Sequence, residues 1–462
     1  MDRSHPLSQA RRYPSELGLA GAAVLVLFSA YVTYALLSSG VYFDDDIQHY
    51  LIAKYSWQHP HLLLDYWGRP AFTILYAPAA ALGFTATRLF SALLAAGVCA
   101  STGYLAWLYG LRRPWLAIAL TGLQPDLMRQ GFSALTELIF ALLLCWALIA
   151  YRRERWGLMA LIVGWLPLAR YESLPLVLIF LVILGRKRQL RWIPLLGLPL
   201  LIQNSFQALW QDNLLLLLFP FSQIIERQGD TTPIYAPGGP LYYILRSPYA
   251  FGAAIFLLGC YGMLRMRPGL LHASVLIVLG VLSVTYAFLP GAAIAGYSRH
   301  LATVAPEMGV LAAFGLSDLL GRVPAGQRRR GLIAGFSSVT ALLIVAQLAL
   351  QVQPFQLTPI QQLTIEAGQW IRAQRSAQVV VSANPWLNHI AELDILNPNQ
   401  TQVLSAEAID QARPGTWFVW DSHYAKGMLF KIPLATLQDD PRLSVVKSWR
   451  NQEDEIHLYQ KR

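Results

Sequence analysis

Apolar runs close to the length of a membrane-spanning helix recur along most of the chain, and they constrain its fold more than any other feature. About 20 apolar residues are enough to cross the hydrocarbon core of a bilayer as a helix. Charged residues make up 13% of the chain, whereas roughly a quarter is usual for a soluble domain. The sequence therefore predicts a polytopic α-helical membrane protein.

Eleven runs are predicted to span the membrane: 17–38, 86–110, 114–127, 133–151, 156–169, 173–185, 192–210, 241–264, 270–289, 300–320 and 331–350. If Arg11 and Arg12 are cytoplasmic and each run crosses once, the basic clusters between runs fall on the cytoplasmic side. These clusters are Arg112/Arg113, Arg152/Arg153/Arg155, Arg186/Lys187/Arg188/Arg191, Arg265/Arg267 and Arg322/Arg328/Arg329/Arg330. We expect a multi-pass protein of a bacterial inner membrane or its equivalent, with a cytoplasmic N-terminus.

Two apolar runs do not fit a single full-length span. The run 70–84 is short and contains Pro70 and Pro78, so it is interpreted as re-entrant or interfacial. The run 156–185 is interrupted by Arg170-Tyr171-Glu172, so it is interpreted as two short spans that turn on the outer side. Short spans indicate a thinned or tilted region, as around a cavity open to the outer side.

The charge balance and the cysteines exclude other classes of function. The net charge is +10, but the basic residues lie in short clusters between apolar runs. This arrangement is a topology signal and does not indicate nucleic-acid binding. Cys99, Cys145 and Cys260 all lie inside apolar runs, so neither a disulfide framework nor a metal cluster is indicated.

The composition changes near residue 351. Residues 358–375 have the periodicity of an amphipathic helix, and short β-type runs follow it. These runs are 378–382, 415–420, 443–449 and 456–460. We therefore expect two domains: a transmembrane domain over 1–350, with an outer loop over 39–85, and a small α/β extracytoplasmic domain over 351–462. The second domain has no assignable motif, and Asp421-Ser422-His423 is interpreted as ordinary surface.

The outer loop carries the strongest chemical signal. The acids Asp44 to Asp46 follow the first span directly and precede a segment with helical periodicity. In that segment Ile47 and Tyr50 share one face and Ser56 lies off it, which predicts a helix along the membrane surface. Acids are costly at a membrane boundary and are retained there mostly for chemistry or ion binding. They could also cap the helix, but a cap needs one acid and not three.

Further polar residues are predicted to meet these acids on the outer side: Arg69, Arg170, Glu172, Arg299 and His300. A guanidinium group makes bidentate, charge-assisted contacts with phosphate. A carboxylate can act as general base toward a hydroxyl or, with a divalent cation, neutralise phosphate. A base beside a phosphate clamp at the lipid boundary predicts transfer of a group from a lipid phosphate to an acceptor hydroxyl.

Structural roles remain open for several of these residues. Arg170 and Glu172 could form an ion pair that holds two short spans together. Arg69 and Arg299 could anchor the chain at the membrane interface. Other polar residues are interpreted as interhelical hydrogen-bonders or as solvated loop residues, and they are Asp126, Glu137, His59, His61 and Asp65.

Several motifs resemble those of the GT-C superfamily of integral membrane glycosyltransferases. The segment DDIQHYLIAK over 45–54 resembles the acidic pair, aromatic residue and Ala-Lys that follow the first span of that superfamily. Gly68-Arg69-Pro70 resembles its Gly-(Lys/Arg)-Pro step, and TRLFS over 87–91 resembles the start of its next span. The segment SRHLATVAPEMGVLAAFGL, from Ser298, resembles its Arg-(Tyr/His)-Leu…Pro helix. The resemblance covers roughly residues 17–350 and is closest to the protein O-mannosyltransferase and aminoarabinose transferase branch.

The resemblance implies an inverting, mannosyltransferase-like enzyme that moves a sugar from a polyprenyl phosphate to a hydroxyl of a glycan, lipid or protein. The resemblance implies that Asp45 is the general base and that Asp46 supports it. It also implies that Arg69 and Arg299 bind the departing lipid phosphate. This chain has three acids where the superfamily usually has two, so Asp44 is an alternative base. Asp44-x-Asp46 also resembles the Asp-x-Asp of lumenal mannosyltransferases, which makes this pair a candidate site for Mg²⁺ or Mn²⁺.

Two other functions are compatible with a basic-inside helical bundle. A transporter or flippase of lipid-linked saccharides would be favoured by intramembrane charges on both sides and by repeated halves, and the sequence shows neither. A structural membrane protein would use its outer domain to bind a partner. Acids that gather on one side of the membrane favour the transferase.

Overall fold

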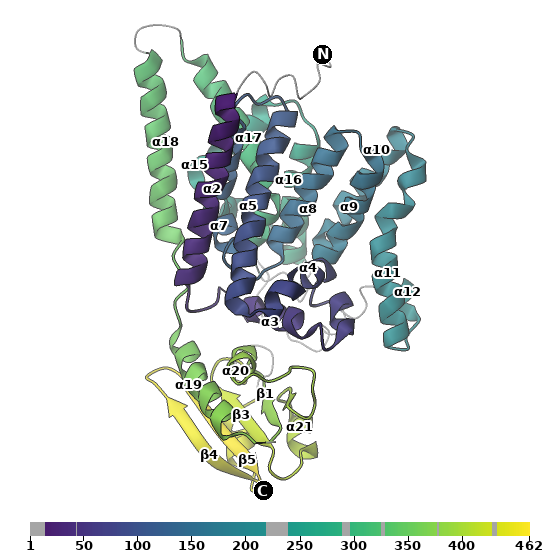
Figure 1. The fold of residues 1–462 in the computed structure, drawn as a ribbon, viewed down its shortest axis with the longest axis vertical. Coiled ribbons are helices and arrows are strands. Elements are labelled where there is room, and N and C mark those ends of the chain that lie inside the picture. Colours follow the sequence, from purple (N-terminus) through teal and green to yellow (C-terminus); the bar gives the residue numbers. More distant parts are fainter. Residues whose placement is uncertain are drawn as a thin grey trace.

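A bundle of helices is followed by a small sheet domain that lies at one end of the bundle (Figure 1). The computed structural model describes residues 14–42, 44–218, 239–288, 296–324, 329–376, 378–426 and 432–462. The predicted class, a polytopic helical protein with a small C-terminal α/β part, is confirmed by this arrangement.

The bundle is built from helices that often begin at a proline, where the missing N–H costs no hydrogen bond. In chain order they are α2 (Pro14–Leu37), α3 (Asp44–Tyr55), the 3₁₀ helix η1 (Pro60–Leu64), α4 (Pro70–Ala81), α5 (Phe84–Leu108), α6 (Pro114–Gly122), α7 (Pro125–Gln130), α8 (Glu137–Arg152), α9 (Trp156–Ala169), η2 (Tyr171–Ser173), α10 (Leu174–Arg186), η3 (Leu190–Trp192), α11 (Pro194–Trp210), α12 (Leu215–Leu218), α14 (Tyr242–Ala250), α15 (Ala253–Arg265), α16 (Leu270–Phe288), η4 (Ser298–Val304), α17 (Ala305–Arg322) and α18 (Arg329–Gln351).

Five segments of the described chain are long and apolar enough to cross a membrane, and α14 with α15 adds a sixth if that bent pair is one span. The five are Ser15–Leu37, Phe84–Leu108, Leu270–Phe288, Ser298–Arg322 and Arg329–Gln351. They make the chain a multi-pass membrane protein. The predicted count of eleven spans is not confirmed, because other predicted spans form shorter helices, such as α6 with 9 residues and α8 with 16.

The region 241–264 is not the single straight span that the sequence predicts. Its two helices, α14 and α15, meet at a bend of 115°. Gly252 lies between them with a φ of 85°, a left-handed conformation that glycine adopts without strain. The first amide of α15, on Ala253, donates to the side-chain oxygen of Gln347 in α18 at 2.7 Å, which fixes the bend against a neighbouring helix.

The two runs 70–84 and 156–185 form short helices, and their predicted places relative to the membrane stay predictions. The run 70–84 contains α4, which has 12 residues and is too short to cross a bilayer. The run 156–185 divides into α9 and α10 at the 3₁₀ turn η2. The hydroxyl of Tyr171 in this turn donates to the carbonyl of Tyr66 at 2.9 Å. The turn therefore lies beside the loop that leads into α4.

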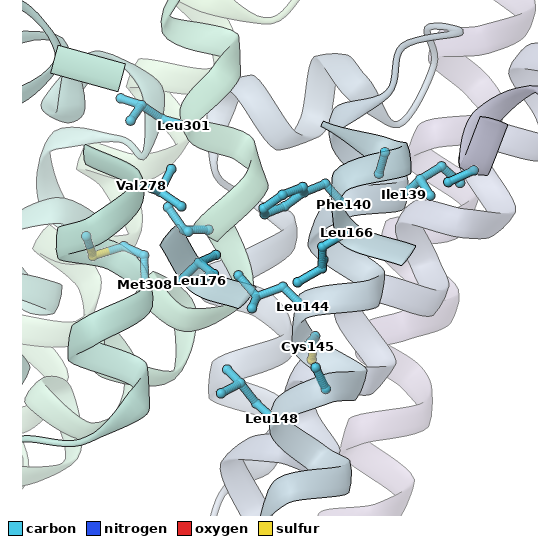
Figure 2. Close-up of a cluster of buried hydrophobic side chains, with 14 of the residues drawn as sticks. Ile139, Phe140, Leu144, Cys145, Leu148, Leu166, Leu176, Val278, Leu301 and Met308 are labelled. Atoms are coloured by element: carbon cyan, nitrogen blue, oxygen red, sulfur yellow. The ribbon is translucent and has the colours of Figure 1, made fainter. Parts of the chain in front are cut away.

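The core of the bundle centres on α8, and Figure 2 shows one part of it. Phe140, Leu144 and Leu148 of α8 face Leu166 of α9 and Met308 of α17 in this cluster. All five side chains are buried. Lipid tails are as apolar as these side chains, so the cluster stabilises the bundle through close van der Waals packing. The cluster fixes α8, whose first residue belongs to the polar site described below.

Close backbone contact joins α15 to α17. A Cβ atom at Gly262 would meet the carbonyl oxygen of Leu311, and one at Gly315 would meet that of Leu258. Small residues allow helices to approach in this way, which is a common means of packing in membrane proteins. This contact holds α17, and with it η4, against the rest of the bundle.

Helix α3 forms over the predicted segment, but it does not have one exposed face as expected. Three acids occupy its first turn and Lys54 its last turn, which suits the helix dipole. His49 packs on Phe72 of α4 at 5.2 Å between ring centroids, and Tyr50 packs on His389 of the sheet domain at 5.2 Å. Ser56, expected off the buried face, is itself buried. The helix is buried on several sides because α4 and the sheet domain both cover it.

The sheet domain contains five strands in the order β2-β1-β3-β5-β4. The pairs β1–β2 and β1–β3 are parallel, whereas β3–β5 and β4–β5 are antiparallel. Its elements are α19 (Pro359–Gln374), β1 (Val380–Ser382), α20 (Pro385–Ile390), β2 (Thr401–Gln402), α21 (Ala406–Gln411), β3 (Trp417–Asp421), α22 (Leu434–Gln438), β4 (Leu443–Arg450) and β5 (Glu455–Lys461). The predicted helix and all four predicted strands are present, and the sequence missed only the two-residue β2 among the described strands.

Candidate active site

The three acids of α3 point to three different partners. Asp45 forms an ion pair with Arg299 of η4. Asp46 is fully buried and accepts hydrogen bonds from the amides of Ala134 and, at 3.2 Å, Tyr42. Asp44 accepts a hydrogen bond from the hydroxyl of Tyr424 in the sheet domain. Successive side chains of a helix point in different directions, so the three adjacent carboxylates contact three different parts of the protein.

A polar pocket opens beside Asp45. It encloses about 410 Å³, including the part that is open to solvent. The described residues that line it are Asp45, His49, Trp67, Arg69, Leu135, Thr136, Glu137, Arg170, Arg299 and His300. Three guanidinium groups and two carboxylates are among these side chains, and Leu135 is the aliphatic member. A hollow with this lining suits an anionic, hydroxyl-rich ligand.

Arg299 and Arg170 are the buried cations of the pocket. Arg299 is 4% exposed and contacts Asp45, while its Nε lies 3.6 Å from Glu137 Oε1. Arg170 bonds Glu137 Oε1 with one Nη and Glu172 Oε1 with the other, each at 2.9 Å. Buried charges persist where partners and hydrogen bonds satisfy them. Ion pairs therefore connect these side chains into one network: Glu172, Arg170, Glu137, Arg299 and Asp45.

Glu137 is the centre of that network, and its role was not predicted. It is the first residue of α8 and is 1% exposed. Besides Arg170 and Arg299, it has His300 Nε2 at 3.9 Å from its Oε1. From the sequence, Glu137 is interpreted as an interhelical hydrogen-bonder. It does contact other helical segments, but its place in the lining of the pocket was not predicted. The available signal was an acid at the first position of an otherwise apolar run on the outer side.

Arg69 lies on the pocket wall in an unusual backbone conformation. Its φ is 57°, in the left-handed region that most non-glycine residues avoid, and residues held there cluster at functional sites. Its guanidinium group lies over the ring of Tyr171 at 4.0 Å. One of its nitrogens, Nη1, is buried and has no hydrogen-bond partner among the described residues. This nitrogen is available to an anion that enters the pocket.

The remaining predicted residues are close to the pocket. His300 lines it, and its Nδ1 lies 3.2 Å from the hydroxyl of Tyr243. Glu172 reaches the network through Arg170 and does not itself line the pocket. The structure thus brings Asp45, Arg69, Arg170, Arg299 and His300 together around one hollow. Asp44 and Asp46 lie beside it and interact elsewhere.

Protonation states follow from burial and from the arginines. Burial acts to raise the pKa of Asp45, but Arg299, His49 and Arg170 together outweigh it and hold that pKa below its usual value. Burial has the larger effect at Asp46, where it raises the carboxyl pKa despite Arg88 and the two amides. Burial also lowers the pKa of His49 to about 3, so this imidazole is neutral at physiological pH. Asp45 is therefore the ionised carboxylate of α3 that faces the pocket.

The two acids predicted to hold a cation do not form a shared set of ligands. Asp46 uses its two oxygens on backbone amides, and Asp44 contacts Tyr424 and His423. Among the described residues, no group of three or more His, Cys, Asp or Glu side chains could hold a metal ion. The divalent cation stays a prediction.

The fold and the pocket together define a polytopic membrane protein with an ionic site at one end of its helices, beside a small α/β domain. This fold is that of ArnT, a GT-C aminoarabinose transferase. ArnT from Cupriavidus metallidurans in the apo state aligns with a TM-score of 0.61 over 96% of this chain and 98% of that one, at 14% identity. The same protein bound to undecaprenyl phosphate aligns with a TM-score of 0.54 at 13% identity, with the same coverage of both chains.

The likeness is one of structure. No protein-family model matches the sequence, and no curated protein matches it. The resemblance to GT-C transferases that the motifs indicate is confirmed at the level of the fold.

Proposed function

We propose that this protein is an inverting glycosyltransferase that moves a sugar from a polyprenyl phosphate to an acceptor hydroxyl, with Asp45 as the general base. The observation that carries the proposal is the placement of Asp45 in one pocket with Arg69, Arg170 and Arg299. An ionised carboxylate beside several guanidinium groups provides both a proton acceptor and a receptor for phosphate. ArnT, which shares the fold, is known bound to undecaprenyl phosphate, and this supports a polyprenyl-linked donor.

In the proposed reaction the acceptor oxygen attacks the anomeric carbon of the sugar from the face opposite the phosphate. The bond between that carbon and the phosphate oxygen breaks, and its electron pair leaves with the lipid phosphate. The hydroxyl proton passes to the carboxylate of Asp45. This carboxylate is 34% exposed, which leaves it accessible to a substrate hydroxyl. A base placed in this way supplies about 10²–10⁴-fold of rate.

The arginines act on the leaving group. Negative charge develops on the lipid phosphate as the sugar departs, and preorganised cations stabilise it more in the transition state than in the ground state. Arg69 has a buried nitrogen with no hydrogen-bond partner among the described residues, so it can bind this phosphate without giving up a hydrogen bond. Arg299 and Arg170 are held in place by Glu137. Arg69 is therefore the first candidate for the phosphate contact.

Trp67 supplies a surface for the sugar ring. It lines the pocket and its indole nitrogen donates to Gln48 Oε1 at 3.1 Å, which restrains the ring. An indole presents a large apolar face with a polar edge, and a pyranose has apolar faces of similar size. Mannose as the transferred sugar stays a prediction, as does the identity of the acceptor.

The pocket is proposed to face away from the cytoplasm. Helices α8, α15 and α17 each finish with an arginine, namely Arg152, Arg265 and Arg322. These ends lie on the side of the bundle remote from the sheet domain (Figure 1). The positive-inside rule then puts the N-terminus in the cytoplasm and the sheet domain outside.

The test is transfer of a labelled sugar. Membranes that contain the protein are incubated with a panel of radiolabelled polyprenyl-phosphate sugars and candidate glycan, lipid and protein acceptors. We expect label to leave the lipid and Asp45→Asn to reduce the rate by about 10²–10⁴-fold, with the donor still bound. Asp439→Asn, at an exposed carboxylate of the sheet domain, serves as the matched control and keeps full activity.

Two results would contradict the proposal. Full activity in both Asp45→Asn and Asp44→Asn would remove the general base from α3. Movement of the intact labelled lipid across sealed vesicles, without transfer, would instead identify the transporter or flippase that the sequence left as the alternative. A parallel incubation with a chelator tests the predicted divalent cation.

A further inference from the structure

The segment after β3 in the sheet domain reaches the first turn of α3. The hydroxyl of Tyr424 donates to Asp44 Oδ1, and His423 Nε2 lies 3.4 Å from Asp44 Oδ2. Asp44 is separated from Tyr424 by 380 positions in the sequence. The two sheet-domain side chains thus hold both oxygens of the carboxylate next to Asp45. The interpretation of Asp421-Ser422-His423 as ordinary surface is wrong.

The turn that presents these two side chains is built into the sheet domain. Asp421, the last residue of β3, is fully buried, and its Oδ1 accepts from the amides of His423 at 3.0 Å and Tyr424 at 2.6 Å. Side chains of Asp that bond amides two or three residues ahead fix a turn in this way. Tyr424 is also buried in one apolar cluster with Trp420 and Ile432. Its hydroxyl is therefore held in position by a rigid core.

The rest of the sheet domain is docked along the same region. His59 Nε2 lies 2.8 Å from Asp394 Oδ2. The ring of His389 meets the ring of Tyr50 edge to face at 5.2 Å, and Trp386 meets Phe84 at 6.2 Å. Polar and aromatic contacts along α3 and its flanking segments hold the domain in one place. Tyr424 and His423 form the part of this interface that touches the first turn of α3.

We propose that Tyr424, assisted by His423, is a positioning residue for the transferase: it fixes Asp44 so that the first turn of α3 presents Asp45 to the pocket. The inference rests on the proposed function. Three adjacent carboxylates repel one another, and terminal helical turns fray readily. Asp46 is fixed on one side by the amides of Ala134 and Tyr42, and Asp44 is fixed on another side by the sheet domain. With both neighbours engaged, Asp45 is the acid left to face the substrate.

This arrangement gives the sheet domain a part in catalysis without a contact to substrate. Neither Tyr424 nor His423 is among the described residues that line the pocket. Their loss would leave the arginines in place and move only the base. A small displacement of a catalytic group costs rate much more than it costs substrate binding. The expected signature is a fall in kcat with little change in KM.

The experiment compares Tyr424→Phe with wild type in the labelled-sugar assay. We expect Tyr424→Phe to lower kcat about tenfold and to leave KM for the donor within about twofold. Tyr459→Phe removes a hydroxyl from a tyrosine of the same apolar cluster, and we expect it to keep wild-type kinetics. His423→Ala, at a side chain that is partly exposed, gives a second and smaller loss of kcat without disturbing the core of the domain.

A double-mutant cycle separates positioning from general structural damage. If Tyr424 acts through Asp44, then Tyr424→Phe with Asp44→Asn is no slower than Asp44→Asn alone. Multiplicative losses in the cycle, or wild-type kcat in both Tyr424→Phe and His423→Ala, would overturn the inference. An inactive wild-type protein would instead overturn the proposed function, so the two failures are distinguishable.

Discussion

The two ends of the helical bundle each place one carboxylate between two arginines, and they differ in exposure. At the pocket end, Glu137 contacts Arg170 and Arg299 at 2.9 and 3.6 Å. At the other end, Asp318 contacts Arg322 and Arg265 at 2.8 and 3.4 Å. The geometry is similar, but the Glu137 side chain is 1% exposed and that of Asp318 is 26% exposed.

This difference in exposure supports the proposal that the buried charges, and not the exposed ones, take part in the reaction. Ion pairs exposed to water contribute roughly 0–1 kcal/mol, so the Asp318 cluster adds little to stability. Buried ions lose their hydration and depend on every partner that they have. A chain keeps such a cluster at a pocket where the low dielectric strengthens its interaction with a charged ligand.

The largest effect is expected from Glu137→Gln. It leaves the buried guanidinium groups of Arg170 and Arg299 with one carboxylate fewer, and removing one partner of a buried pair costs about 3–5 kcal/mol. Arg170 keeps Glu172 and Arg299 keeps Asp45, so the lower end of that range is expected. The measurement is the apparent melting temperature of the purified protein in detergent.

Asp318→Asn is the matched control at the opposite end. It removes the same charge from an exposed cluster, and the expected loss is at most about 1 kcal/mol. Equal losses in the two variants would show that burial does not set the contribution of these ion pairs. A large loss of transfer activity in Glu137→Gln alone would show that only the buried cluster serves the reaction.

A smaller effect is expected from Arg69→Lys. Lysine keeps the charge but loses the planar fork, and a charge-assisted hydrogen bond is worth about 1.5–3 kcal/mol. We therefore expect kcat/KM for the lipid-phosphate donor to fall about 10–100-fold, with folding preserved. The comparison is Arg267→Lys, at an exposed arginine of the basic end, which keeps wild-type kinetics. An unchanged kcat/KM in Arg69→Lys would show that the phosphate binds elsewhere.

The sequence predicts the pocket well where charges interrupt apolar runs. Arg170-Tyr171-Glu172 divides a long apolar stretch, and the structure has the turn η2 there. Arg299 and His300 lie at the start of the tenth predicted span, 300–320, and line the pocket. A charge in an apolar run is conspicuous because its burial is costly without a function or a partner.

The sequence predicts less where contacts join distant segments. Glu137 looks like any interhelical polar residue until Arg170 and Arg299 are placed around it. Tyr424 carries no local signal, since its partner Asp44 lies in another domain. The span count is not confirmed because hydropathy does not distinguish a crossing helix from a short or bent one, such as α6 or α14 with α15.

The smallest expected effect is on the pH dependence of stability, through the contact between His423 and Asp44. The side chains of this contact are about as exposed as that of Asp318. His423 is 41% and Asp44 27% exposed at the side chain. The hydrogen bond to Asp44 raises the pKa of His423 against the effect of burial, with Asp421 and Asp454 acting in the same direction. A raised folded-state pKa gives stability that is fully present below the unfolded value, about 6.5, and is lost as the pH rises through the folded value.

The melting temperature of wild type is therefore expected to fall slightly more between pH 6 and pH 9 than that of His423→Gln. Solvent screens a pair that is this exposed, so the difference is small. Asp44→Asn removes the partner and should give the same reduced slope as His423→Gln. Parallel pH profiles in wild type and His423→Gln would show that this imidazole contributes nothing to docking, and that Tyr424 alone holds Asp44 for the sheet domain.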